Sequence, residues 1–457
     1  MRKLALALVL LGTCLGAWTT AHAQGEDTLR LMREPTSFTD AIDAFDEGDP
    51  FDANLHVAFE RRRTAGTIQR ENGVGIARDS ANWSDVGDWE HVRNELVLGA
   101  DIGVYRDLMI FARLPLVLSD TREVLYPDGA VPTAVDMQLQ EPAVSGDAAL
   151  YRMPFISPTR SGVDTLNLGT AFNVLNQARR PEFPTWMMLF EFRLGIGDIM
   201  EPCEKNATDC DAGVSRGTHA FRFESRMSRR YRYAEVYSGM LFHFEWAGRA
   251  ERKFSPSGSL SGYQNVRPPI QGTFTAGIAF IPWENRESWQ RFSIDLRLQG
   301  TYVSEGRDYS PLFDALGSSQ HPALAIENLE GRPLGGSTTG LRRVPFNGLT
   351  DVQSHGKIGG AVAIEMQAAR YVRFRFGIDV QYITEHVITF SDGCNPNADV
   401  DGANDSRACL LNRDGSANLD EGLLNPHHRP VIDRAGNRFR LDGAVDLNLF
   451  VGAAAQF

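Results

Sequence analysis

The sequence contains no run of 18 or more apolar residues, which excludes a helical membrane span. It is also poor in basic residues, with 46 Lys and Arg against 58 Asp and Glu and a net charge of −12. A general nucleic-acid binder is usually basic, so we do not expect nucleic acid as a partner. The 43 Gly and 22 Pro among 457 residues are ordinary amounts, which excludes collagen-like and disordered compositions.

The first 23 residues have the three features of a secretory signal peptide. Arg2 and Lys3 supply the positive charge, Leu4 to Leu11 supply the apolar stretch, and Ala21-His22-Ala23 is a small-residue cleavage site. We therefore predict that residues 1–23 are a signal peptide that is removed on export.

Cysteine is rare, and its distribution fits an exported chain. Apart from Cys14 in the predicted signal, the cysteines form two sequence-local pairs, Cys203 with Cys210 and Cys394 with Cys409. Because exported chains meet oxidising conditions, we expect each pair to form a disulfide that closes its own loop. A zinc site is the weaker alternative, since no CxxC spacing is present.

The C-terminal segment shows the clearest pattern in the chain. From Leu441 to Phe457 the odd positions are apolar or small, while the even positions include Asp442, Asp446 and Asn448. Soluble strands average about 5–6 residues, so a strand of this length with one apolar face indicates lipid on one side and water on the other. The segment resembles the last strand of bacterial outer-membrane β-barrels, and this resemblance implies that Phe457 is an assembly signal read by the barrel assembly machinery.

The same alternation recurs along the chain and predicts an all-β fold, a transmembrane antiparallel up-and-down β-barrel of about twelve strands. The expected strands are 52–63, 92–104, 108–119, 164–175, 185–196, 218–229, 234–246, 270–282, 291–304, 356–367, 372–388 and the C-terminal one. Short connections near 105–107, 176–184, 230–233, 283–290 and 368–371 are predicted to be periplasmic turns. Long connections at 64–91, 120–163, 197–217, 247–269, 305–355 and 389–440 are predicted to be extracellular loops. Residues 51–457 would form this barrel in the outer membrane of a Gram-negative bacterium, in contact with lipid and lipopolysaccharide.

Residues 24–50 form an acidic lead-in to the barrel, within which 37–45 has the pattern of a short capped helix. The segment could plug the barrel or remain in the periplasm. We favour a periplasmic tail or a contact at the barrel mouth, because chain termini are commonly loose.

A narrower resemblance rests on Gly103-Val104-Tyr105-Arg106-Asp107-Leu108-Met109-Ile110-Phe111-Ala112-Arg113-Leu114-Pro115. This strand-turn-strand is similar to that of uncharacterised outer-membrane barrels grouped with meta-pathway phenol-degradation and aromatic-hydrocarbon transport proteins. The resemblance implies a transport function.

The inward-facing positions of the predicted strands are rich in charge. The predicted lumen-lining residues are Arg113, Glu191, Arg193, Arg222, Glu224, Arg226, Glu235, Glu245, Asp295, Arg297, Glu365, Arg373, Arg375, Asp379 and Asp446. Such a wall can select solutes by sign and size, or it can form a salt-bridged filling. Barrels of about 8 strands are filled by side chains and those of 16–18 leave a channel, so twelve strands permit either. Among these residues Arg222, Arg226, Arg373 and Arg375 could form a basic ladder that faces the acids across the lumen.

Motifs for other chemistry are weak. Asn397, Asp399 and Asp401, followed by Gly402, resemble the start of a calcium loop, but position twelve is Ala408 rather than a bidentate Glu, so calcium is a minor possibility and no other cofactor is expected. No HExxH, GxSxG, P-loop or GxGxxG signature supports an enzyme. His386, next to Glu385, is the best candidate base for an outer-membrane hydrolase.

These observations predict a porin-like outer-membrane channel for passive or facilitated passage of small solutes, and not an enzyme. The alternatives are a structural or surface-interaction barrel with a filled lumen and functional extracellular loops, and, with less support, a hydrolase. The solute and the oligomeric state do not follow from the sequence.

Overall fold

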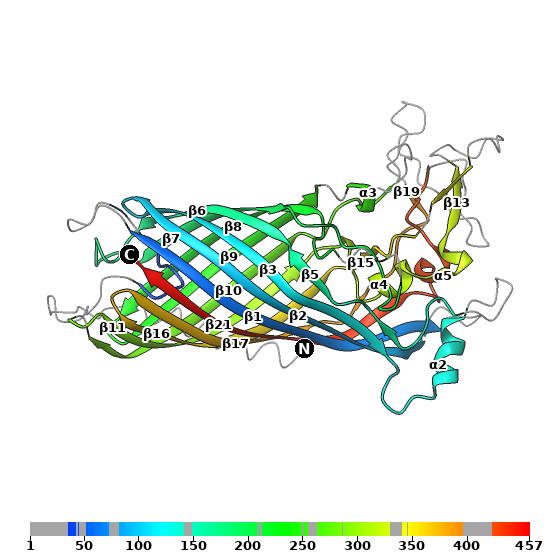
Figure 1. The fold of residues 1–457 in the computed structure, drawn as a ribbon, viewed down its shortest axis with the longest axis horizontal. Coiled ribbons are helices and arrows are strands. Elements are labelled where there is room, and N and C mark those ends of the chain that lie inside the picture. The colour runs from blue at the N-terminus through cyan, green and yellow to red at the C-terminus, as the bar shows by residue number, and fades with distance from the viewer. Residues whose placement is uncertain are drawn as a thin grey trace.

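The computed structural model describes residues 35–42, 44, 52–72, 82–140, 149–207, 210, 213–248, 251–254, 263–285, 287–329, 341–344, 346–395 and 423–457. Its main element is a closed antiparallel β-barrel (Figure 1). The barrel strands are β1 (Ala53–Asn72), β2 (Asn82–Tyr105), β3 (Leu108–Leu125), β6 (Thr165–Leu175), β7 (Thr185–Gly195), β8 (Thr218–Tyr231), β9 (Ala234–Ala247), β10 (Gln271–Asn285), β11 (Gln290–Val303), β16 (His355–Ala369), β17 (Val372–Ile383) and β21 (Phe439–Gln456).

Each barrel strand pairs with the next along the chain, and pairing between β1 and β21 closes the ring. The closing register runs from Asn54 opposite Gln456 to Arg70 opposite Phe439. The C-terminus lies at the end of the barrel where the short turns lie, and the longer connections gather at the other end (Figure 1). The predicted fold class and strand number are therefore confirmed, whereas the alternation of short and long connections fails at the first hairpin, where the connection 73–81 is no longer than the predicted short turn at 176–184.

The first hairpin is longer than the sequence predicts. Residues 64–72 and 82–91, predicted as loop, continue β1 and β2, and β3 likewise runs on to Leu125. The apolar alternation stops near residue 64 because beyond the bilayer neither face of a strand has to meet lipid. Pairing without an apolar face leaves no period-2 signal in the sequence.

A bulge at Gly443 corrects a second expectation. The alternation in β21 predicts that Leu441 faces lipid, but Leu441 is buried in the core at the outer end of the barrel. Gly443 has a φ of 59°, and the β1–β21 register shifts between Gly66 and Thr67, opposite it. One extra residue in a strand reverses which face the following side chains occupy.

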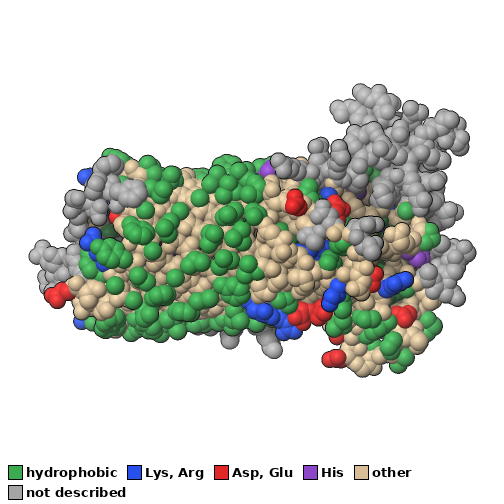
Figure 2. Space-filling view, in the orientation of Figure 1, with side chains coloured by type: hydrophobic (Ala, Val, Ile, Leu, Met, Phe, Trp, Pro, Cys, Tyr) green, Lys and Arg blue, Asp and Glu red, His purple; other side chains and the backbone are tan. Residues whose placement is uncertain are grey.

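The outer wall of the barrel is apolar, as a lipid-facing surface requires (Figure 2). Large hydrophobic side chains such as Leu298 at 72% and Ile358 at 66% remain exposed on it. Two groups of exposed aromatics flank this band: Tyr105, Tyr231, Tyr233, Trp283 and Tyr371 near the short turns, and Trp246, Tyr302 and Tyr382 towards the long loops. The chain is a transmembrane barrel of the Gram-negative outer membrane.

No helix in the described ranges combines the length and the hydropathy of a membrane-spanning segment.

The outer connections fold into a cap over the barrel. Its elements are α2 (Pro132–Leu139), β4 (Phe155–Ile156), β5 (Arg160–Val163), α3 (Glu251–Phe254), β12 (Gly306–Asp308), α4 (Phe313–Gly317), η1 (Pro322–Leu324), β13 (Ile326–Leu329), β14 (Leu341–Val344), β15 (Thr350–Val352), β18 (His386–Val387), β19 (Cys394–Asn395), β20 (Leu423–Leu424) and α5 (Pro430–Asp433). A hydrophobic core that includes Leu139, Leu316, Leu324 and Ile432 joins α2, β4, α4, η1, β15 and α5 to the outer ends of the strands. These loops are thus packed structure rather than separate surface segments.

The predicted disulfide between Cys203 and Cys210 is present in this cap. The predicted pair Cys394–Cys409 lies outside the described residues. The predicted signal peptide at 1–23 and the candidate calcium ligands Asn397, Asp399 and Asp401 lie outside them as well. Phe457 lies at the end of β21, where its backbone N–H donates to the carbonyl of Ala53 at 2.8 Å. Its role as an assembly signal stays a prediction.

Candidate functional site

Three adjoining cavities occupy the interior of the barrel. The outer cavity, of about 800 Å³, lies beneath Tyr309 and Pro311 of the cap. The central cavity, of about 480 Å³, extends from Arg62 and Gln271 to Gly239. The inner cavity, of about 380 Å³, reaches the short-turn end at Asn54 and Gln456. Neighbouring cavities share wall residues, among them Arg222, which borders all three.

The structure places the predicted lumen-lining residues on the inner face of the barrel. All of them line one of the three cavities except Glu235 and Asp295. These two carboxylates are buried and do not border the open space. Glu235 accepts from the backbone N–H of Thr36, and Asp295 accepts from the guanidinium group of Arg297. Strand alternation explains this placement, because every second residue of a barrel strand must face inward.

The charges form ion pairs within the wall rather than two opposed sets. Glu224 lies between Arg222 and Arg226 of its own strand, with both pairs at 2.5 Å. Asp295 binds Arg297 of its own strand at 2.9 Å and lies 3.9 Å from Arg375. The arginine ladder facing acids across the lumen is therefore not what the structure shows. Residues two apart on one strand point to the same side, so pairing along a strand is the shorter route.

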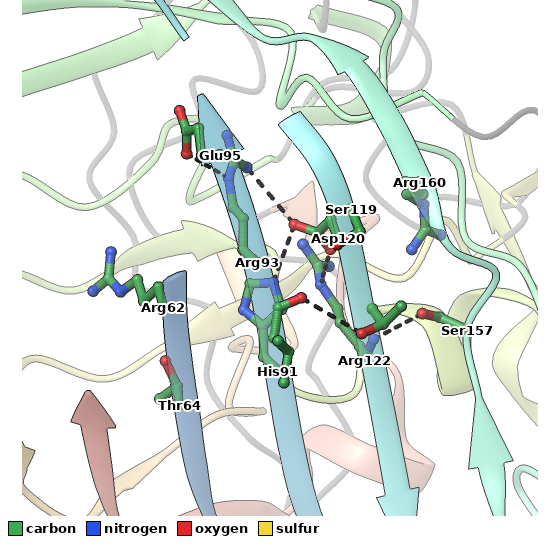
Figure 3. A network of polar contacts seen from close by, with 12 residues as sticks. Arg62, Thr64, His91, Arg93, Glu95, Ser119, Asp120, Arg122, Ser157 and Arg160 are labelled. Atoms are coloured by element: carbon green, nitrogen blue, oxygen red, sulfur yellow. Dashed lines mark hydrogen bonds and ion pairs between the residues drawn. The ribbon is translucent and has the colours of Figure 1, made fainter. Parts of the chain in front are cut away.

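A second charge network, beneath the cap, was missed by the sequence analysis (Figure 3). Asp120 accepts from His91 at 3.1 Å and lies 3.7 Å from Arg93 and 3.5 Å from Arg122. Arg93 also binds Asp164 at 2.6 Å. His91, Asp120 and Arg122 belong to strand ends that were predicted as loops, whereas Arg93 and Asp164 fall at the starts of the predicted strands 92–104 and 164–175. The charged positions 91, 93 and 95 at spacing two were the available signal.

Residues 35–42 and 44, here called the plug segment, lie inside the lumen. The N–H of Thr36 donates to Glu235 at 2.8 Å, Arg226 donates to the carbonyl of Phe38 at 3.0 Å, and Arg373 donates to Asp40 at 2.8 Å. Residues 37–39 form a turn, in which the N–H of Thr39 donates to the carbonyl of Thr36 at 3.2 Å, and not the predicted helix, because the N–H of Thr36 and the carbonyl of Phe38 bind lumen side chains. The described residues of the lead-in therefore contact the lumen wall, and the choice between a plug, a periplasmic tail and a contact at the barrel mouth for residues 24–50 stays a prediction.

Apolar contacts hold the same segment. The ring of Phe38 stacks on Tyr237 with centroids 4.1 Å apart, and the guanidinium groups of Arg226 and Arg297 lie 5.2 and 5.6 Å from its centroid. Ala41 and Ile42 pack on an inward-facing apolar cluster of Met109, Phe111, Ala171, Met187 and Leu189. The contact with Ala41 and Ile42 explains why an apolar patch lies inside a polar lumen.

The residues considered for other chemistry are placed differently. His386 makes a 2.8 Å hydrogen bond through Nδ1 with the carbonyl of Thr384, and its ring stacks on His355 with centroids 3.8 Å apart. Within the described ranges, no hydroxyl or carboxylate is hydrogen-bonded to it, as a hydrolase base would require. No group of three or more potential metal ligands occurs in the same ranges.

Burial perturbs the ionisation of one carboxyl in the cap. Asp433 accepts from the N–H groups of Arg429 and Ser391 at 2.7 and 3.1 Å. Burial raises the pKa of Asp433 to about 7, and the nearby Asp351 adds to this effect, while Arg307 opposes it. His427 and His428 also lie here, and burial lowers the pKa of each, so they stay largely neutral near pH 7.

This carboxyl predicts a pH dependence of the cap. A raised folded-state pKa favours the protonated form, so the stability contributed by Asp433 is fully present below about pH 4 and is lost as the pH rises through about 7. Limited proteolysis of the cap should be faster at about pH 8 than at about pH 5.5, and Asp433→Asn should reduce that difference. An unchanged difference in the variant would contradict the assignment to Asp433.

A scan of the sequence against protein-family models finds no match, and a search of curated proteins finds none either. Solved structures with a similar fold include an outer-membrane channel of Pseudomonas putida F1, with 9% identity over 93% of this chain and 99% of that chain and a TM-score of 0.40. The Pseudomonas putida toluene transporter TodX has 10% identity over 93% of both chains and a TM-score of 0.29. The Escherichia coli outer membrane protease OmpT has 6% identity over 89% of this chain and 96% of its own, with a TM-score of 0.28.

The predicted resemblance to outer-membrane barrels, aromatic-hydrocarbon channels among them, thus has its counterpart in solved structures. With TM-scores below 0.5 and identities of 10% or less, these likenesses say nothing about this chain's solute or reaction. Both have to be inferred from its own residues.

Proposed function

We propose that this chain is an outer-membrane channel for small solutes, in which the plug segment restricts the passage. The observation that carries this proposal is the series of three adjoining, charge-lined cavities inside a closed barrel. A solute in such a lumen meets water and charged walls instead of hydrocarbon, so polar molecules can cross the membrane there. The proposed activity is the passage of a solute without any chemical reaction.

A matched pair of substitutions on β10 tests the proposal. Thr275 lines the central cavity, whereas the adjacent Phe274 is 45% exposed on the lipid-facing wall. In proteoliposomes, we expect the wild-type chain to release a small hydrophilic solute faster than protein-free liposomes. Thr275→Trp should slow this release because a large ring fills the passage, while Phe274→Trp should leave it unchanged. Release equal to that of protein-free liposomes would contradict the channel.

A structural or surface-interaction barrel is the second candidate, and two observations favour it. Ion pairs between neighbouring lumen residues fill part of the interior, and the outer loops share a hydrophobic core. This candidate predicts no solute release from either β10 variant or from the wild type. Lipase and protease assays on the folded protein test the hydrolase alternative, for which His386 lacks the necessary contacts in the described part of the chain.

A further inference from the structure

The charges on the lumen wall are unevenly distributed among the three cavities. In the described part of the chain, the outer cavity is lined by eight Arg or Lys and seven Asp or Glu side chains, and the inner cavity by five of each. Among the described residues, the central cavity is lined by seven cationic side chains and a single carboxylate, Glu224. Excess positive charge is therefore concentrated in the middle of the lumen, in a protein whose net charge is negative.

The cations of the central cavity face the open space, while their partners lie behind them. The side chains of Arg62, Arg193 and Arg375 are 51%, 34% and 35% exposed. The side chains of their partners Asp446, Glu191 and Asp295 are only 3%, 9% and 12% exposed. Buried carboxylates in the wall thus hold the guanidinium groups in place without covering them.

Several donors in this cavity have no protein acceptor. Within the described residues, the Nε atoms of Arg222 and Arg375 are buried and have no hydrogen-bond partner. Lys357 makes neither a hydrogen bond nor an ion pair with any described residue. The two Nε atoms are closed off from the cavity, whereas Lys357 is half-buried on its wall, so the ammonium group of Lys357 is available to an anion there.

The cations approach the cavity from opposite sides of the barrel. Arg193 is on β7 and Arg375 is on β17, and these strands lie half-way round the ring from each other. Arg222 on β8 and Lys357 on β16 are likewise separated by several strands on either side. An anion between them would be contacted from both sides, which favours a molecule with two negative groups over one with a single charge.

We infer that the central cavity is a binding site for small oxyanions with two negative charges, such as dicarboxylates or phosphate. This inference deepens the proposed channel function by naming its substrate class. The volume of about 480 Å³ lies within the range of small-molecule sites, and charge-assisted hydrogen bonds from several arginines are the usual means of holding such anions. The plug segment contributes Ser37 and Phe38 to the same cavity.

Calorimetric titration of the detergent-solubilised full chain with succinate at neutral pH tests the site without requiring transport. Lys357→Gln should weaken succinate binding about tenfold, because one cation is lost and no carboxylate is left without its partner. Arg61→Gln makes the same change in net charge on the exposed side of β1, outside the cavity lining, and should leave binding unchanged. The neutral isostere succinamide should not bind.

Inorganic phosphate, titrated in parallel, distinguishes a general oxyanion site from a dicarboxylate site, and binding of either anion supports the inference. Binding of neither anion, or equal binding by wild type and Lys357→Gln, would overturn it. If that variant does not fold, Arg375→Gln replaces it, since Asp295 keeps Arg297 at 2.9 Å. Solute release without anion binding would support the channel and refute only this anion site. Anion binding without solute release would support the anion site and refute the channel.

Discussion

Replacing residues 35–44 by a glycine–serine segment of equal length should raise the single-channel conductance several-fold in planar bilayers. The replacement keeps the chain length but removes the ring of Phe38, the carboxylate of Asp40 and the apolar side chains of Ala41 and Ile42 from the lumen. The cross-section open to ions then increases along the inner and central cavities, both of which the segment lines.

A single substitution should give a smaller effect of the same sign. Phe38→Ala removes one stacked ring pair and two cation–π contacts, together about 2 kcal/mol, which corresponds to roughly a 30-fold shift towards the released segment. More frequent or longer openings in single-channel recordings would report that shift. Conductance that is unchanged in both the replaced chain and Phe38→Ala would show that the plug segment does not restrict the passage.

Asp314→Ala should unfold or loosen the cap and leave the barrel intact. Asp314 is 2% exposed and binds Arg160, which is fully buried, at 2.5 and 3.3 Å. It also accepts from the N–H of Cys203 at 3.2 Å and lies 3.7 Å from Arg122, so it joins α4 to three other segments. Removing one member of a buried pair leaves an uncompensated charge and costs about 3–5 kcal/mol.

Hydrogen–deuterium exchange separates the two parts of the molecule. Amides of α4 and β5 should exchange faster in Asp314→Ala, while those in the membrane-spanning parts of β10 and β11 should stay protected. Asp128→Ala is the matched control, because Asp128 is exposed on an outer connection. Equal exchange in wild type and Asp314→Ala would contradict the structural role given to this carboxylate.

The barrel was predictable because lipid imposes a strict rule on sequence. Wherever a strand crosses the bilayer, as β11 does with Ile294, Leu296 and Leu298, every second residue must be apolar. The rule fails outside the bilayer, where the added lengths of β1 and β2 pair without an apolar face. It fails again at Gly443, since one bulged residue reverses the face of Leu441 without altering the composition.

The sequence indicates which residues face the inner side of the barrel, but it does not indicate which residues they pair with. Alternation indicates that Arg222, Glu224 and Arg226 face inward, yet it does not indicate that they bind one another rather than groups across the lumen. The plug segment carried the pattern of a short helix but no signal for its place in the lumen, because Thr36, Phe38 and Asp40 bind residues that are nearly 190 or more positions distant in the chain. Contacts of that kind depend on the closed ring, which a local pattern does not contain.

The central claim is that lipid covers the outer wall and water fills the lumen, so that neighbouring residues of one strand meet different solvents. Spin labels at Leu298 and Gln299, attached in separate variants in which Cys394 and Cys409 are replaced by serine, test this in lipid bilayers. Leu298 is 72% exposed on the outer wall, and Gln299 lines the central cavity. We expect oxygen to relax the label at 298 and a water-soluble nickel complex to relax the label at 299. Equal responses at the two positions, or the reverse order, would contradict the account.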